Sequence, residues 1–435
     1  MTGRAAAESA VDIAIVGGGM VGASLALLLS HLKADWRIRV IESFPLQSTA
    51  TLSPSFDGRS TALSHSSREI FELLGLWQSL YSGLTEIRQV HVSDRGHFGR
   101  ARLTAAEQNL PALGYVVENR QLGDVLMAAL QRAPGVEVTA PAQVVAVSPS
   151  SRGMQLQVSS DDTDAVEMIS ADLLVVADGA QSQTRQRLAI DSRCKDYGQA
   201  AVVANIGLQL DHGGIAYERF TDLGPMAMLP LQPMAGEHRC AMVWTMPPEQ
   251  AAELLAADEA EFLARLQQRF GYRLGPFVRV GSRQVYPLSL ITSEEQVRRH
   301  LVVVGNAAHS LHPVAGQGFN LALRDVAVLA ETLGEAAENH QAPGELSVLQ
   351  QYLQRQQLDQ QQTILLSDFL PRVFGMHSIP MALLRNTGLL ALDTVPLLRH
   401  QFTRLGMGLE TRGTPMLGNT LGNTLGNTLG NTTGG

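Results

Sequence analysis

The segment VDIAIVGGGMVGASLALLLSHL, which begins at Val11, constrains the fold more than any other part of the sequence. An apolar, strand-like run ends in glycines and a helix-like run follows, so the segment predicts a strand, a tight turn and a helix. Gly17, Gly19 and Gly22 have the spacing G-x-G-x-x-G. The first glycine permits the tight turn, the second lets backbone approach a pyrophosphate, and the third lets the helix pack closely on the strand.

A second strand and an acidic residue strengthen this interpretation. The run RIRVIE ends at Glu42, about 20 residues after Gly22, where a carboxylate can accept hydrogen bonds from both ribose hydroxyls. The helix N-terminus supplies free N–H donors and a partial positive charge to the phosphates. We therefore predict a nucleotide site here, in preference to a merely structural tight turn.

Two later segments return to the same pattern of a buried strand followed by polar residues. The run ADLLVVADGAQSQTRQRL leads to Asp178 and Gly179, and the run LVVV leads to GNAAHSLHPVAGQGFN, residues 305 to 320. These returns predict that one nucleotide-binding domain is assembled from separated parts of the chain. Simple nicotinamide dehydrogenases do not need such an arrangement.

The third segment holds two histidines, His309 and His312, whose spacing could present two metal ligands on one face of a helix. Pro313 follows directly, and no Cys, Asp or Glu in the stretch completes a zinc set, so we predict no metal site. Acid/base work stays open because imidazole titrates near neutrality, and so does the role of a packed loop histidine. Gly316 and Gly318 favour a third function, in which main chain lies against a flat ring at the start of the helix FNLALRDVAVLAETL.

The composition is that of an ordinary globular protein. The 435 residues suffice for two domains, and 45% hydrophobic residues with a net charge of −8 give no basic footprint for nucleic acid. Two cysteines, Cys194 and Cys240, predict no disulfide framework and suit a reducing cytosol. No secretory signal and no run of about 18 apolar residues is recognisable, so we expect no membrane-spanning helix.

The three motifs, in this order, resemble the FAD-dependent aromatic-ring monooxygenases of the p-hydroxybenzoate hydroxylase type, over roughly residues 10 to 405. The glycine turn with Glu42 matches the adenosine-end motif of that family, and Asp178 with Gly179 matches its D-G motif, near FAD and the nicotinamide path. The third segment matches the G-D motif, but this chain has Asn306 where most members have aspartate. An amide can still bond a ribitol or ribose hydroxyl.

Four further segments, FDGRSTALS, VHVSDRGHFG, YERFTDLGPMAMLP and LHPVAGQGFNLALRD, resemble the ubiquinone-biosynthesis branch of the family. The resemblance implies that NAD(P)H reduces FAD, that O₂ forms a C4a-hydroperoxyflavin, and that its distal oxygen is transferred to a polyprenylated phenol such as 2-polyprenyl-6-methoxyphenol. It implies a cytoplasmic protein. Peripheral contact with the inner membrane face and a ubiquinone-biosynthesis protein complex are further expectations, since a polyprenyl substrate would suit both.

The resemblance also implies the site residues. His312, Pro313 and Gly316 are the candidate catalytic positions, no metal is expected, and no base or relay for the phenol is identified. Asn119 stands where relatives have Arg or Gln, with Arg120 as the alternative contact. The expected cofactor-binding residues are Gly17, Gly19, Gly22, Glu42, Arg59, Asn119, Asp178, Gly179, Asn306, Gly316, Gln317, Gly318 and Asn320.

The predicted fold class is α/β: a Rossmann-like FAD-binding domain built from discontinuous segments, an antiparallel β-sheet substrate domain and a C-terminal helical region. Short β-prone runs punctuated by GG, GP and MAGEH indicate the antiparallel sheet, and PPEQAAELLAADEAEFLARLQQRF indicates one amphipathic helix. LGNT repeats predict a flexible tail. The expected ranges are 10–84, 116–192 and 284–340 for the FAD-binding domain, 85–115 and 193–283 for the substrate domain, 341–410 for the helical region and 411–435 for the tail.

Other functions stay open beside hydroxylation. A halogenase of the same fold would resemble its relatives through W-x-W-x-I-P, whereas Trp36, Trp77 and Trp244 are isolated here. A prenyl reductase is harder to exclude from the sequence. A non-catalytic FAD-binding subunit of a biosynthetic complex has no need for the segment that faces the flavin ring.

Overall fold

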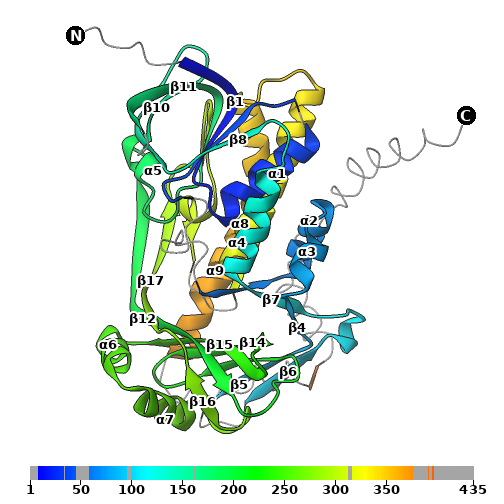
Figure 1. The fold of residues 1–435 in the computed structure, drawn as a ribbon, viewed down its shortest axis with the longest axis vertical. Helices are drawn as coiled ribbons and strands as arrows, with labels where there is room; N and C mark the ends of the chain where they lie inside the picture. Colours follow the sequence, from blue (N-terminus) through cyan, green and yellow to red (C-terminus); the bar gives the residue numbers. More distant parts are fainter. Residues whose placement is uncertain are drawn as a thin grey trace, which may run out of the picture.

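A computed structural model describes residues 8–33, 35–45, 58–95, 99–160, 163–311, 316–375, 390 and 394–395. Its larger α/β part is built on an eight-stranded sheet with the order β18-β19-β11-β1-β2-β8, at the top of Figure 1. The antiparallel strands β9 and β10 extend this sheet from β11. The strands are β1 (Glu8–Val16), β2 (Ile38–Ile41), β8 (Val136–Thr139), β9 (Ala142–Pro149), β10 (Met154–Ser160), β11 (Thr163–Val176), β18 (Val297–Arg298) and β19 (Leu301–Val303).

Five strands of this sheet, β19, β11, β1, β2 and β8, run parallel. Val16 at the end of β1 lies opposite Val176 of β11 and Ile41 of β2, and Val176 lies opposite Val303 of β19. Strands that are far apart in the sequence therefore end side by side. The predicted convergence of the three strand ends is confirmed.

Helices cover one face of the eight-stranded sheet. The helix after β1 is buried along most of its length because it packs between the sheet and two other helices. The opposite face packs on β9 and β10, as is usual for a parallel sheet buried on both sides. The helices of this part are α1 (Met20–Leu32), α2 (His65–Leu73), α3 (Trp77–Tyr81), α4 (Asn119–Leu130), α5 (Gln183–Arg187), α8 (Gln317–Glu338) and α9 (Leu346–Gly375).

A nine-stranded sheet with the order β20-β17-β12-β15-β14-β13-β5-β6 forms the other part, with β16 paired to β12. Nearly all its neighbouring strands are antiparallel, as the punctuated β-prone runs predicted; β13 and β5 are parallel. Its strands are β5 (Gln89–Asp94), β6 (Arg100–Thr104), β12 (Ser192–Leu208), β13 (Ile215–Phe220), β14 (Pro225–Met234), β15 (Glu237–Met246), β16 (Phe277–Val280), β17 (Gln284–Ser293) and β20 (His309–Ser310).

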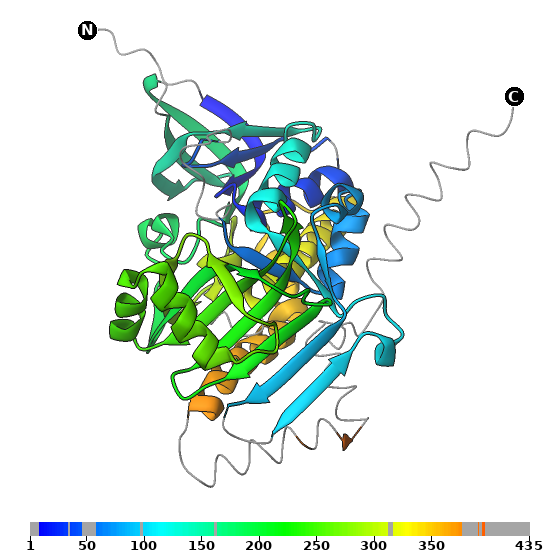
Figure 2. The same cartoon turned by 60° about the horizontal axis from the view of Figure 1, so that its bottom comes forward.

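The outer face of the nine-stranded sheet is covered by α6 (Pro248–Ala256) and α7 (Glu259–Phe270), on the side away from the eight-stranded sheet (Figures 1 and 2). The prediction of a single helix here was wrong. Asp258 caps α7 by accepting a hydrogen bond from the backbone of Glu261 at 2.8 Å, so a new helix starts where the first was expected to continue.

A three-stranded sheet of β3 (Ser60–Leu63), β7 (Gly114–Glu118) and β4 (Thr85–Ile87) lies between the two large sheets. Its apolar side chains share a core cluster with the inner face of the nine-stranded sheet. The predicted boundary at residue 284 falls at the start of β17, which pairs with β12 through Ser293. The domain ranges remain predictions.

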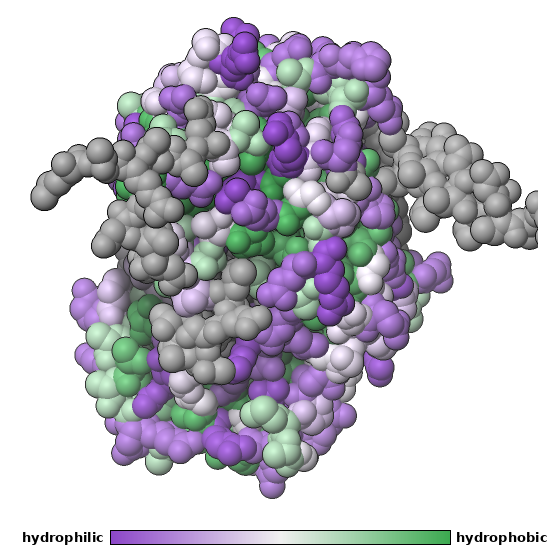
Figure 3. Space-filling model, turned by 45° about the horizontal axis from the view of Figure 1, so that its top comes forward, coloured by the Kyte–Doolittle hydropathy of each residue, from purple (hydrophilic) through white to green (hydrophobic). Residues whose placement is uncertain are grey.

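The face seen in Figure 3 is mainly hydrophilic, with apolar residues gathered near its middle. Within the described ranges, no helix is long and apolar enough to cross a bilayer. The predicted C-terminal helical region begins with α9, whereas the LGNT repeats lie outside the described residues.

Candidate flavin site

A cleft of about 690 Å³ opens at the carboxyl ends of the parallel strands. Residues that follow β1, β2, β11 and β19 line it together with Phe319 and Ala322 of α8. The cleft therefore joins segments that the sequence separates by hundreds of positions. Among the predicted cofactor-binding residues, its lining includes Gly17, Gly19, Glu42, Arg59, Asp178, Gly179 and Asn306.

The glycine turn has the geometry that a dinucleotide site requires. Gly17 has a φ of +104°, and a Cβ there would lie 2.5 Å from the carbonyl oxygen of Ala177. A Cβ on Gly22 would lie 1.9 Å from the carbonyl oxygen of Gly17, so only glycine allows α1 to approach the strand. Gly19 is the N-cap of α1 and gives no side-chain cap, which leaves N–H donors at the cleft.

Glu42 is held in the cleft by backbone donors. Its Oε2 accepts a hydrogen bond from the N–H of Gly18 at 2.7 Å, and its Oε1 accepts one from Phe44 at 3.0 Å. The hydroxyl of Ser43 also donates to Oε1, at 3.3 Å. A carboxylate has about four acceptor positions, so one remains for a hydroxyl group. This arrangement fits a ribose at the adenosine end.

Asp178 provides an independent test of whether a nucleotide fits. Its Oδ2 accepts a hydrogen bond from the N–H of Thr184 at 3.1 Å, whereas its Oδ1 is buried and has no partner among the described residues. A buried acceptor without a donor costs free energy. A hydroxyl of the ribityl chain would supply the missing donor, so the chemistry of the cleft fits FAD.

Arg185 connects the second and third motifs, a role that the sequence did not assign. Its buried guanidinium donates to the carbonyl oxygen of Ala307 at 2.6 Å and to that of Ala180 at 3.3 Å. Ser182 caps the short helix that carries it, by accepting a hydrogen bond from its N–H at 2.9 Å. In the sequence, the S-x-x-R spacing of Ser182 and Arg185 indicates only the helix cap. It does not reveal the bond to Ala307, because that carbonyl lies more than a hundred residues away.

The third motif ends at the first turn of α8. Gly316 is the N-cap with a φ of +61°, and no side chain caps the helix. Among the described residues, a Cβ on Gly318 would meet nothing within 4 Å, so these residues leave space beside the N–H groups of the first turn. This space suits a flat ring that carries negative charge. Asn306 is exposed in the cleft, and the predicted catalytic residues His312 and Pro313 lie outside the described residues.

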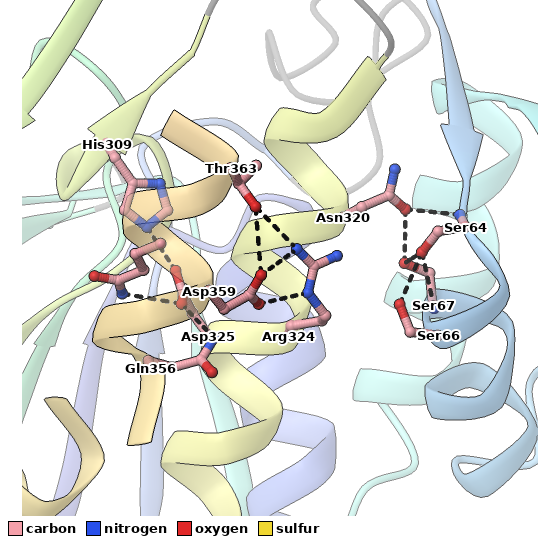
Figure 4. A network of polar contacts seen from close by, with 11 residues as sticks. Ser64, Ser66, Ser67, His309, Asn320, Arg324, Asp325, Gln356, Asp359 and Thr363 are labelled. Carbon is pink, nitrogen blue, oxygen red and sulfur yellow. Dashed lines mark hydrogen bonds and ion pairs between the residues drawn. The ribbon is translucent and has the colours of Figure 1, made fainter. Parts of the chain in front are cut away.

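Asn320 has all four hydrogen-bonding positions of its amide occupied by the protein. Its Oδ1 accepts from the N–H of Ser64 at 2.8 Å and the hydroxyl of Ser67 at 2.7 Å (Figure 4). Its Nδ2 donates to the carbonyls of Ala62 and Gly316. The arrangement ties β3 and α2 to the start of α8. It leaves no free amide position for a direct contact with FAD.

His309, the first of the two histidines in the third motif, has a structural role. Its Nε2 lies 2.6 Å from Oδ2 of Asp325, and both side chains are almost fully buried (Figure 4). Gln356 and Gln360 of α9 donate to the other oxygen of Asp325. His309 therefore packs the third motif onto α8. In the described part of the chain, no group of three or more metal-ligating side chains occurs.

The other residues that were predicted to contact FAD do not all lie at the cleft. Arg59 lines the cleft, with its guanidinium 4.7 Å from the centre of the Tyr286 ring. Asn119 does not line the cleft: it is buried, its side chain accepts a hydrogen bond from Thr61 at 2.6 Å, and its N–H donates to the carbonyl of Arg59 at 2.8 Å. Arg120 is exposed, and Gln317 is buried in the first turn of α8.

Comparisons with known proteins agree with this site. Residues 10–364 match the family described as FAD binding domain. The chain is 36% identical to the ubiquinone hydroxylase UbiL of Rhodospirillum rubrum over 402 residues, 92% of this chain and 90% of that protein. It is 31% identical to the 3-demethoxyubiquinol 3-hydroxylase of Escherichia coli over 399 residues, 92% of this chain and 98% of that protein.

Solved structures agree on the fold. The structure of PqsL from P. aeruginosa in complex with 2-aminobenzoylacetate has a TM-score of 0.72 at 22% identity, covering 88% of this chain and all of that one. The flavin-dependent brominase Bmp2 has a TM-score of 0.71 at 16% identity, covering 97% and 99%. A fold shared with a brominase does not select the reaction. NAD(P)H is the electron donor typical of FAD-dependent monooxygenases. The family match and the relatives, together with the cleft and its motifs, show that the chain belongs to the FAD binding domain family, as an FAD-dependent monooxygenase.

Proposed function

We propose that this protein hydroxylates the ring of a polyprenylated phenol, 2-polyprenyl-6-methoxyphenol, in ubiquinone biosynthesis. The observation that carries the proposal is the convergence of three strand ends on one cleft whose buried acceptor, Oδ1 of Asp178, has no donor among the residues that the structure describes. Two relatives more than 30% identical over most of the chain are named for hydroxylation of ubiquinone precursors or ubiquinone itself, which supports this substrate class.

Each motif has a defined task in this proposal. The turn at Gly17 and Gly19, with Glu42, holds the adenosine end, and Asp178 and Asn306 bind hydroxyls of the linking chain. Bound FAD supplies hydride acceptance and oxygen activation, which no side chain can provide. The first turn of α8 directs its N–H groups toward the position where a reduced flavin ring carries negative charge.

Hydroxylation at a different carbon of the ring is an alternative within the same substrate class. The Escherichia coli relative is named for 3-hydroxylation of 3-demethoxyubiquinol, a different substrate of the same class. Prenyl reduction is the alternative with the same fold but without O₂, and a non-catalytic FAD-binding subunit is the alternative without turnover. The products distinguish all of these.

The test uses purified protein with FAD, NADPH and 2-geranyl-6-methoxyphenol under isotopically labelled O₂. We expect a product that carries one labelled oxygen atom on its ring, and NMR of that product gives the ring position. A product with a saturated geranyl chain and no label would replace hydroxylation with prenyl reduction. Absence of any product, with NADPH oxidised at the same rate with and without each phenol tried, would contradict catalysis.

Peripheral membrane contact is a further part of the proposal. Leu358, Leu365 and Phe369 of α9 are 62%, 69% and 56% exposed. Their spacings of seven and four residues place them on one face of the helix. A surface of this kind would suit delivery of a substrate that resides in the bilayer. Flotation with phosphatidylglycerol vesicles measures the contact, and a triple change of these residues to Ser is expected to abolish flotation.

A further inference from the structure

Glu218 lies in the middle of β13, between two strands of the nine-stranded sheet. It pairs with Ala227 of β14 and with Val92 of β5. Tyr217 faces the outer core, where its ring packs edge to face on Phe270 of α7. Because neighbouring side chains in a strand alternate between faces, Glu218 faces the inner side.

The inner face meets the FAD-binding part of the molecule. Ala216, two residues before Glu218, packs in the cluster shared with the three-stranded sheet. On the same face, Asn205 donates to the carboxylate of Glu118 at 3.3 Å, at the start of α4. Tyr286, also on this face, stacks with Arg59, which lines the flavin cleft. Glu218 therefore belongs to the surface that closes over the cofactor site.

The neighbours of Glu218 on this face form a row of small apolar side chains. Cross-strand pairs continue from Glu218 through Ala227 and Val243 to Val203. These three residues are only partly buried, whereas the alternating positions on the outer face are buried. A partly exposed apolar row inside the molecule suits an aromatic ring with a prenyl chain.

The Glu218 carboxylate has no hydrogen bond or ion pair with any described residue. Burial alone raises its pKa to about 7. Asp94 is the only titratable side chain on the same face within two register positions on β5, β6 and β14. The elements packed against this face contribute apolar side chains, among them Ile87 and Val116. They also contribute Glu118, which pairs with Arg239, and Arg59, which stacks on Tyr286. An unpaired carboxylate in such surroundings suits proton transfer near neutral pH.

We propose that Glu218 accepts the proton of the substrate's phenol hydroxyl; the inference rests on the proposed function. The O–H bond breaks, its electron pair stays on the phenol oxygen, and the proton moves to the carboxylate. The ring carbons ortho and para to the oxygen become more nucleophilic. When the ring regains aromaticity, the hydrogen that the attacked carbon loses leaves as a proton, and the carboxyl group can return its own proton to the oxygen.

The test compares Glu218→Gln, which keeps the size and polarity of the side chain but cannot accept the proton, with Glu237→Gln. Glu237 lies in the same sheet and pairs with Arg279 at its surface, so its variant is the matched control. We expect Glu218→Gln to bind FAD normally and to hydroxylate 2-geranyl-6-methoxyphenol at least about 100-fold more slowly. Glu218→Asp should recover part of the loss.

A second measurement does not depend on turnover. The affinity for 2-geranyl-6-methoxyphenol, measured by difference absorption on titration, should rise with pH through about 7 in the wild type, because the ionised carboxylate accepts a charge-assisted hydrogen bond from the phenol O–H, and should not change in this range in Glu218→Gln. Equal hydroxylation rates and an equal pH dependence of binding in both proteins would overturn the role of Glu218 while leaving the proposed function intact. A wild type that neither binds nor hydroxylates the phenol would overturn the proposed function and this inference together.

Discussion

Asp178 shows how one unsatisfied atom identifies a ligand. Its Oδ2 accepts a hydrogen bond from the backbone of Thr184, and its Oδ1 is buried with no donor in the described part of the chain. A protein that must place an acceptor for a cofactor leaves it unpaired until the cofactor binds, and it loses stability in the meantime. The stability lost in the free protein should return as affinity for FAD.

We expect Asp178→Asn to weaken FAD binding by roughly 10- to 100-fold, because a hydrogen bond to a charged acceptor is lost. Quenching of flavin fluorescence on titration measures the dissociation constant. Asp191→Asn, at an exposed position later in the chain, is the control and should bind FAD as the wild type does. Equal affinities for all three proteins would show that Oδ1 has no hydroxyl partner.

The sequence predicted single residues well where backbone geometry dictates the amino acid. Gly17 and Gly22 are such cases, because a Cβ would collide with the backbone at both positions. Side chains whose role depends on a partner far along the chain were missed. Arg185 donates to the carbonyl of Ala307, which lies far along the chain. The role of Glu218 depends on which face of β13 points to the inside of the molecule, and the residues YERF alone do not reveal that.

Helix α8 contributes in two ways at the scale of elements. Its first turn borders the open space beside Gly318, and its third turn carries Asp325, which binds His309. One rigid helix therefore sets both the ring-facing loop and the packing of that loop onto the core. A change at either end tests a different part of this arrangement.

Gly318→Leu tests the ring-facing end. A Cβ at Gly318 would meet none of the described residues within 4 Å. We therefore expect a folded protein that retains some FAD but hydroxylates roughly 100-fold more slowly, because a displaced ring loses its alignment with the substrate. Oxygen uptake compared with product and peroxide measures this uncoupling. Coupled turnover at the normal rate would show that no ring lies there.

His309→Ala tests the contact between the third motif and Asp325 of α8. It leaves the buried carboxylate of Asp325 without its closest partner, so the free energy of unfolding should fall by about 3 kcal/mol. Urea denaturation of the protein without cofactor gives the value. His340→Asn, at an exposed position after α8, should change it little. A loss as small as that of the control would mean that Gln356 and Gln360 suffice to satisfy Asp325.

The whole molecule should show the cost of keeping Glu218 unpaired. Its pKa is about 7 in the folded state and near 4.5 when unfolded, because burial disfavours the charged form. Between these values the folded protein holds a proton that the unfolded chain has released, so stability falls as pH rises from about 4.5 to 7.

Glu218→Gln removes this pH-dependent cost. Its free energy of unfolding should match that of the wild type near pH 4 and exceed it at pH 8, by roughly 1 to 3 kcal/mol. Thermal or urea unfolding at the two pH values provides the comparison, with Glu237→Gln as the control. A difference that is the same at both pH values would indicate a packing effect rather than ionisation.

The overall architecture could be predicted from the sequence more completely than the boundaries of its helices and the pairing of its strands. Three buried runs that end in glycine or polar residues were enough to predict a convergent nucleotide site, because parallel strands end at one edge. The split of the expected helix into α6 and α7, and the pairing of β17 with β12, depend on local capping and on long-range register. Periodicity alone carries no information about either.

The position of β19 also has a consequence for synthesis on the ribosome. β11 pairs with β1 on one side; on the other it pairs with β10 over its first part and with β19 only over Leu174–Val176. A nascent chain that ends before residue 301 therefore leaves the end of β11 with an unpaired edge. Such an edge is a template for pairing with a second nascent chain. Prematurely terminated products should therefore aggregate instead of binding flavin, and a chaperone that shields this edge would matter most just before the last third of translation.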